Sequence, residues 1–142
     1  MQKLVRERGC EARFELDSAG VGSWHVGEPA DARMRRHAAT RGYELDGRAR
    51  QVHKEDFDQF DYIIAMDERN FDDLRMMDRK GRHRAKIHRM TSFCRETKNV
   101  AEVPDPYYGG AEGFETVLNI LEDACTGLLE ELLSKQTVSA DR

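Results

Sequence analysis

The chain has 142 residues, of which 39% are hydrophobic and 35% are charged, and its formal net charge is −4. This length favours one domain with a core of useful size. No window approaches the ~18 apolar residues of a membrane span, and an acidic balance disfavours wholesale nucleic-acid binding, so we expect neither a membrane nor a nucleic acid as partner.

Three cysteines, Cys10, Cys94 and Cys125, form an odd set at wide spacing. This favours free thiols in a reducing compartment, the cytoplasm, over a disulfide framework. The sequence has no C-x-x-C pair and no Cys/His cluster, and its histidines show no ligand spacing. We therefore expect no structural metal ion and no cofactor.

The first half of the chain predicts short elements joined by loops. Residues 1–9 have apolar side chains at i, i+3 and i+4 before a glycine, which is typical of the last turns of a helix. Residues 12–17 alternate between apolar and polar, which predicts a strand, and residues 18–23 are expected to form a loop. Pro29 is expected to open a helix of about 12 residues that Gly42 closes.

The second half predicts longer elements. Residues 60–66 are expected to form the principal strand, because their core is apolar on both faces, as in a strand that is covered on both sides. Asp67 suits the N-cap of a following helix. Residues 85–87 predict a short strand, and residues 112–133 predict a long amphipathic helix.

Strands that alternate with helices predict an α/β fold, in which a parallel sheet lies between layers of helices. We expect a single domain over residues 1–135 and a disordered tail over residues 136–142. Sites in such sheets form at the carboxyl ends of strands. The loops that follow residue 17 and residue 66, together with the loop around Asp105, are therefore expected at one rim.

The segment V-P-D-P-Y-Y-G-G, residues 103–110, places one carboxylate between two prolines and follows it with paired tyrosines and paired glycines. Each proline fixes its own φ and keeps the preceding residue extended, and the glycines permit a sharp reversal. The pattern predicts a stiff, exposed loop that holds Asp105, Tyr107 and Tyr108 in a fixed relation. An ordinary surface turn is the alternative interpretation.

A basic run lies between the two strands of the second half. Two interpretations are open: a solvated surface, or a surface that attracts an acidic or phosphorylated partner. Between Arg75 and Arg89, the run contains Arg79, Lys80, Arg82, His83, Arg84, Lys86 and His88.

Taken together, these segments resemble the low-molecular-weight protein tyrosine phosphatases. The resemblance extends from residue 1 to about residue 133, and it rests on the order and spacing of six short segments. They are F-E-L-D-S-A-G (14–20), W-H-V-G (24–27), A-R-Q-V (49–52), F-D-Y-I-I-A-M-D (60–67), A-K-I (85–87) and D-P-Y-Y-G (105–109).

The resemblance implies hydrolysis of phosphotyrosine proteins or small aryl phosphates through a phosphocysteine. In that mechanism an arginine and backbone N–H groups at a helix N-terminus hold the phosphate. The family's loop has the pattern C-x-x-x-x-x-R-S/T and follows the first strand. This sequence lacks it, because the residues six positions after its three cysteines are Leu16, Val100 and Glu131.

We therefore expect an incomplete product that lacks about 20 residues at its amino end, namely the first central strand, the nucleophile loop and two helical turns. Such a chain is expected to be poorly stable, because unpaired sheet edges are exposed, and inactive as given. One alternative is a genuine non-catalytic relative that binds an acidic or phosphorylated partner. Another is an arsenate reductase-type relative. Bacterial family members often act opposite tyrosine kinases, so a tyrosine kinase system is a further expected partner.

The resemblance also implies roles for individual residues. Asp105 matches the general acid that protonates the leaving tyrosyl oxygen. Trp24, Tyr107 and Tyr108 match positions that line the aryl-substrate cleft, although simple packing of these rings is an alternative. Ser18 matches a residue that braces the phosphate loop.

Other residues are expected to have structural roles. Arg41 stands where several relatives have a histidine that supports the phosphate loop. Asp67 is expected to act as a helix cap and not as a catalyst. The three cysteines are expected to be passive thiols.

Overall fold

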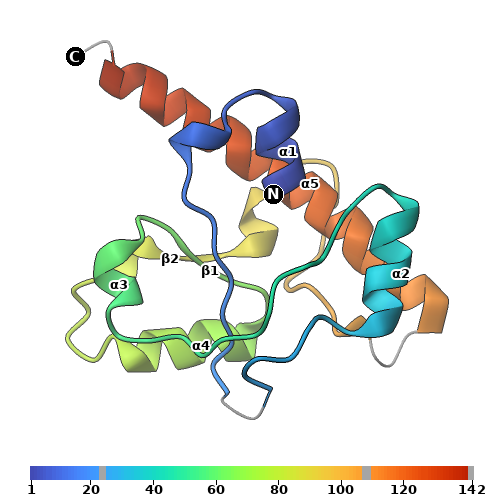
Figure 1. Cartoon of the computed structure of the whole chain (residues 1–142). Coiled ribbons are helices and arrows are strands. Elements are labelled where there is room, and N and C mark those ends of the chain that lie inside the picture. The colour runs from blue at the N-terminus through green and yellow to red at the C-terminus, as the bar shows by residue number, and fades with distance from the viewer. Residues whose placement is uncertain (23–24, 107–109, 141–142) are drawn as a thin grey trace.

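The computed structural model describes residues 1–22, 25–106 and 110–140 (Figure 1). From residue 56 on, helices and two short strands alternate, whereas the described residues before it form helices and loops without a strand. The helices are α1 (Gln2–Glu7), α2 (Ala32–Thr40), α3 (Asp56–Gln59), α4 (Glu68–Met77) and α5 (Gly110–Ala140), the strands are β1 (Ile63–Ala65) and β2 (Ile87–Arg89), and the 3-10 turns are η1 (Glu11–Arg13), η2 (Arg84–Lys86) and η3 (Met90–Phe93).

The two strands pair in parallel, with Ile64 opposite His88. Ile63 packs into a core cluster with residues of α3 and α4, whereas Ile64 packs against a cluster that α5 dominates. Successive side chains of a strand point to opposite faces, so helices cover both faces of the sheet, and Figure 1 shows β1 between α4 and α5. The predicted α/β class and the prediction of a strand covered on both sides are confirmed.

The strand predicted over residues 12–17 does not form. Residues 11–13 form η1, and the chain that follows is extended, with Phe14 and Leu16 half-buried beside Val5 and Leu129 and the residues between them exposed. Within the described residues, no backbone hydrogen bond joins residues 15–19 to another segment. The alternation therefore predicts the inward positions of Phe14 and Leu16 but not that of Ala12, which is exposed. Within the described residues, the segment has no ladder partner.

Several element boundaries differ from the prediction, and β1 is shorter than the strand expected over residues 60–66. Helix α2 begins after Asp31, because Pro29, expected to open it, forms an antiparallel β-bridge with Arg48 instead. The Asp31 carboxylate caps the helix by accepting a hydrogen bond from the backbone N–H of Arg33 at 2.8 Å. Strand β2 starts two residues later than expected, because η2 occupies the preceding turn. Helix α5 continues to Ala140, so residues 136–140, expected in a disordered tail, extend it.

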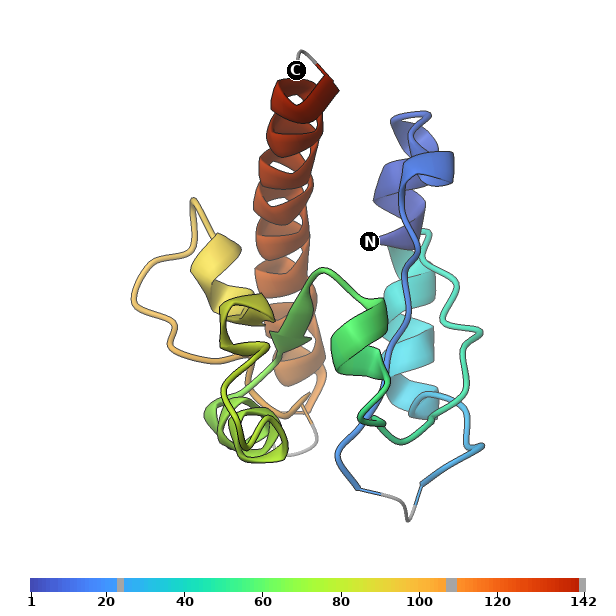
Figure 2. The same cartoon turned by 90° about the vertical axis from the view of Figure 1, so that its left-hand side faces the viewer.

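Helix α5 supplies much of the core. Ala124 and Leu129 are fully buried, and Figure 2 shows the helix running beside η3, so close that a Cβ atom at Gly127 would overlap the carbonyl oxygen of Phe93. Within the described residues, no helix combines the length and apolar character that crossing a bilayer requires.

Candidate active site

The loop that precedes Asp105 is fixed to the carboxyl end of β1. The backbone N–H of Val103 donates to the carbonyl oxygen of Met66 at 2.8 Å, and the Val103 side chain is buried in the core. One residue earlier, a Glu102 carboxylate oxygen accepts from the N–H of Glu68 at 2.9 Å. The segment that leads into the Pro–Asp–Pro sequence therefore runs along the rim at which β1 ends.

Asp105 itself is exposed and lies outside the helices, between the buried Val103 and the first turn of α5. The carbonyl oxygen of Pro106 lies 3.1 Å from the position that a Cβ atom at Gly113 would occupy. A glycine at this point of α5 therefore allows the loop to approach the helix closely. Tyr107, Tyr108 and Trp24, predicted to line an aryl cleft, lie outside the described residues.

Asp67 has the structural role expected from the sequence. Its carboxylate accepts a hydrogen bond from the N–H of Asn70 at 2.7 Å at the start of α4. This satisfies a backbone donor that the first turn of a helix leaves unpaired. The residue directly after β1 therefore serves the helix.

Ser18 lies in a second segment, which Arg50 fixes. Ser18 is exposed, and its backbone N–H donates to the Asp17 carboxylate at 2.8 Å. Arg50 donates to Asp17 at 3.0 Å and, with two nitrogens, to Asp56 at 3.0 and 3.1 Å. The loop that contains Ser18 is thus tied to the start of α3 through one guanidinium group.

The charge of Arg50 has an electrostatic consequence. Its hydrogen bonds lower the pKa of Asp56, against the opposing effect of burial, and keep that carboxylate ionised. Sequence reasoning did not identify Arg50 as a functional residue, although it belongs to the A-R-Q-V segment on which the resemblance partly rests.

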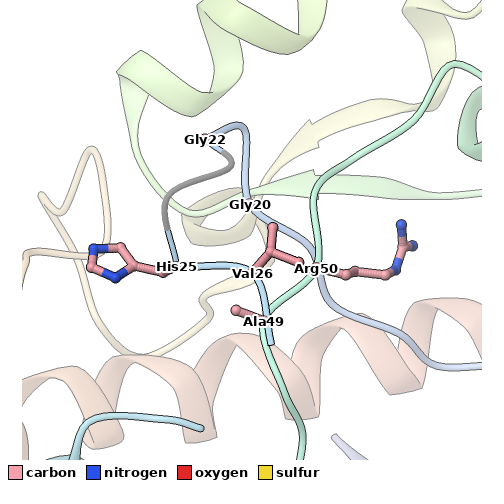
Figure 3. A pocket seen from close by; sticks show the side chains of 6 residues that line it. All are labelled: Gly20, Gly22, His25, Val26, Ala49 and Arg50. Carbon is pink, nitrogen blue, oxygen red and sulfur yellow. The ribbon is translucent and has the colours of Figure 1, made fainter. Parts of the chain in front are cut away.

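A shallow hollow of about 140 Å³ opens beside this segment. Figure 3 shows the side chains of His25 and Arg50 pointing to opposite sides, with Val26 and Ala49 between them. The remaining lining comes from Gly20 and Gly22. Because the lining contains no nucleophile and its two polar side chains diverge, the hollow is not by itself a catalytic centre.

The three cysteines occupy apolar surroundings. Cys10 is 7% exposed, packs with Val5 and Leu129, and its Sγ atom donates to the carbonyl oxygen of Val5 at 3.5 Å. Burial raises the pKa of Cys94, and Cys125 is half-buried on α5. Within the described ranges, no group of His, Cys, Asp and Glu residues could hold a metal ion.

Arg41 serves the contact between α2 and α5. Its guanidinium group donates to both Glu115 and Glu122 of α5, the latter at 3.1 Å. Glu122 also accepts from the Tyr43 hydroxyl at 3.0 Å. Burial first, and the hydrogen bond to Glu122 second, raise the pKa of Tyr43 to about 12. In this structure, Arg41 is therefore bound to helix carboxylates.

A parallel sheet covered by helices on both faces, with the loop of Asp105 near the carboxyl ends of its strands, is the arrangement of small α/β tyrosine phosphatases. The structure superposes on a protein tyrosine phosphatase from Entamoeba histolytica with a TM-score of 0.88 and 41% sequence identity, covering 95% of this chain and 85% of that one. The chain belongs to the low molecular weight phosphotyrosine protein phosphatase family, whose model matches residues 1–138.

Two bacterial relatives agree with this assignment. A low molecular weight protein-tyrosine-phosphatase of Streptomyces coelicolor is 40% identical over 126 residues, which are 88% of this chain and 77% of that protein. One of Bacillus subtilis is 38% identical over 130 residues, covering 91% and 81%. The enzymes of the family are protein-tyrosine phosphatases, which hydrolyse phosphoric monoesters.

Proposed function

We propose that this chain carries the proton-donating side of a phosphotyrosine phosphatase site, with Asp105 as the general acid for phosphotyrosine proteins or small aryl phosphates. The observation that supports this role is the hydrogen bond from Val103 to Met66, which keeps an exposed carboxylate near the carboxyl rim of the sheet. A phenolate is a modest leaving group, so a proton delivered to its oxygen accelerates hydrolysis by about 10²–10⁴.

The aryl ring of the substrate is proposed to bind between Trp24 on one side and Tyr107 and Tyr108 on the other. Stacking of aromatic rings contributes about 0.5–1.5 kcal/mol beyond the burial of area. Ser18 is proposed to brace the phosphate-binding loop, and the anchoring of its segment by Arg50 supports that role.

We further propose that none of the three cysteines of this chain is a competent nucleophile. None of its cysteines is followed by an arginine at the sixth position. Cys10, the cysteine nearest the amino end, is buried among apolar side chains, and its Sγ atom faces the carbonyl oxygen of Val5 and not solvent from which a substrate could approach. Without an arginine and a ring of backbone N–H groups around it, a thiol does not stabilise the charge of a phosphoryl group in transfer.

The direct experiment measures hydrolysis of para-nitrophenyl phosphate and of a phosphotyrosine peptide by the purified chain. We expect no hydrolysis above background, and equally none from Cys10→Ser. Ordinary turnover that Cys10→Ser abolishes would identify Cys10 as the nucleophile and overturn the proposal. Turnover that survives this substitution would require a nucleophile elsewhere.

The role of Asp105 is tested in a chimera that places a strand and a C-x-x-x-x-x-R-S loop ahead of Met1. We expect the chimera to hydrolyse aryl phosphates, and Asp105→Asn to lower kcat by about 10²–10⁴ while inorganic phosphate still binds. Asp61→Asn, which changes an exposed carboxylate elsewhere, is the matched control. Equal turnover of the two variants would exclude Asp105 as the acid.

We also propose residues 1–135 as one domain and the cytoplasm as its location, with a tyrosine kinase system as the source of its substrates. Helix α5 packs in one core cluster with residues of η3 and in another with Val5 and Cys10 near the amino end. This packing of one helix against both parts of the chain supports a single domain. Limited proteolysis that leaves a fragment close to this length is the expected result, and early cleavage between α2 and α4 would contradict it.

A further inference from the structure

The loop between α4 and β2 has exposed cationic side chains that form no ion pair within the described part of the chain. Figure 1 shows this loop at the left edge of the molecule, on the side opposite α2. Four of its arginine and lysine side chains are exposed, and none of these four forms an ion pair with a carboxylate of the described residues. We call residues 79–84 the basic loop, and these four side chains are Arg79, Lys80, Arg82 and Arg84.

Neighbouring cations, by contrast, have structural partners. Arg89 pairs with Glu68 and lies over the Phe71 ring at 3.8 Å. The Lys86 ammonium donates to the carbonyl oxygen of Phe57 at 2.7 Å. The basic run therefore contains two kinds of residue, those that stabilise α3, α4 and β2 and those of the basic loop, which form no comparable contact.

The backbone of the basic loop is held in place from within. The buried Asp78 accepts the N–H of His83 on its carboxylate at 3.1 Å and the N–H of Gly81 on its carbonyl oxygen at 2.9 Å. Gly81 has φ of +66°, a conformation that side chains disfavour. Because the backbone of the loop is fixed, less conformational entropy is lost when a partner binds the four cations.

Charge and apolar surface together indicate the partner. Residues 75–89 contain seven arginines and lysines and one acid, in a chain whose net charge is −4. Like charges that lie near one another in the sequence repel, and no carboxylate of the described residues offsets those of the four basic-loop side chains. Met76, 73% exposed in the last turn of α4, is a large apolar side chain three residues before Arg79 in the sequence.

We propose that the basic loop and Met76 form a docking surface for an acidic, extended segment of another protein that carries an apolar residue. Residues 75–89 contain no Phe, Tyr or Trp, the side chains on which single-stranded nucleic acids stack. Met76 is the one large apolar side chain of this run that is exposed, too little for insertion into a lipid surface. The proposal is independent of the phosphatase chemistry, because it needs neither Asp105 nor a nucleophile.

The test measures fluorescence anisotropy of a labelled, unphosphorylated peptide of glutamates with interspersed leucines. We expect binding that weakens with salt, and a loss of about tenfold or more in affinity when Arg79, Lys80, Arg82 and Arg84 are all changed to Glu. The matched control changes Arg35, Arg36, Lys54 and Lys98 to Glu, which alters the net charge equally at scattered exposed sites. Met76→Gln is expected to weaken binding a few-fold.

Four results would overturn the proposal. The first is no binding of the acidic peptide by the unmodified chain, and the second is an equal loss of affinity in the two quadruple variants. The third is tighter binding of a single-stranded oligonucleotide or of phosphatidylserine vesicles than of the peptide. The fourth is self-association that the basic-loop variant abolishes, which would make a second copy of the chain the occupant.

Discussion

Arg50 holds both carboxylate oxygens of Asp56, at 3.0 and 3.1 Å, while its Nε atom donates to Asp17. Asp56 also accepts the backbone N–H of His53 at 2.8 Å. One guanidinium group therefore connects the segment of Ser18 to the turn before α3. Because Asp56 is nearly buried, the loss of its partner leaves a desolvated charge behind.

Replacement of Arg50 by Met should therefore lower the free energy of unfolding by about 2–3 kcal/mol. Urea denaturation followed by circular dichroism measures the change. Arg6→Met removes a solvent-exposed pair with Glu11 at 3.8 Å and is the control, expected to change stability by no more than a few tenths of a kcal/mol. Equal midpoints for the two variants would show that the Arg50 contacts contribute little.

Asp123 predicts how stability depends on pH. Burial raises the pKa of Asp123, but hydrogen bonds from the backbone N–H groups of Arg95, Thr97 and Glu96 outweigh it and lower the pKa to about 2. Because the pKa of Asp123 is lower in the folded protein than in the unfolded chain, the ionised carboxylate stabilises the fold at pH values above the unfolded-state pKa. This stability is lost as the pH falls toward about 2. Asp123→Asn should therefore destabilise the protein at neutral pH and flatten its acid unfolding curve. A variant curve parallel to that of the unmodified chain would contradict this.

Gly127 is expected to tolerate no side chain. The Cβ atom of an alanine would overlap the Phe93 carbonyl oxygen, so η3 and α5 would have to separate. We expect Gly127→Ala to cost about 3 kcal/mol or more, or to prevent folding. Gly47, with open space where a Cβ atom would lie, is the control, and its alanine variant should melt within a few degrees of the unmodified chain.

Cys10 should react slowly with alkylating reagents in the folded protein. It is buried, and its thiol donates to the carbonyl oxygen of Val5. We expect labelling by iodoacetamide at neutral pH at least about tenfold slower than in urea, as peptide mass spectrometry would measure. Rapid labelling of the native chain would indicate an accessible thiolate and would support Cys10 as a nucleophile.

Elements determined by local signals are the ones that sequence reasoning predicts well. Residues 63–65 are apolar on both faces and form the strand covered by helices. Asp67 caps α4 as expected, and the predicted inward face of α5 includes the buried Val117 and Leu129. In each case, the information lies within a few residues along the chain.

Features that depend on distant partners are predicted less well. Alternation over residues 12–17 cannot tell whether a second strand lies alongside, and no ladder forms. The contact between Arg50 and Asp17 joins residues 33 apart in sequence, so no local pattern indicates it. Asp105 stands out locally between its prolines, whereas the hydrogen bond from Val103 to Met66 becomes visible only in the folded chain.

The cations of the basic loop make the charge of this acidic chain uneven along its sequence. The chain has a formal net charge of −4, whereas residues 79–84 contain four arginines and lysines and no acidic residue. In an external field or near a charged body, the molecule should orient before it makes contact.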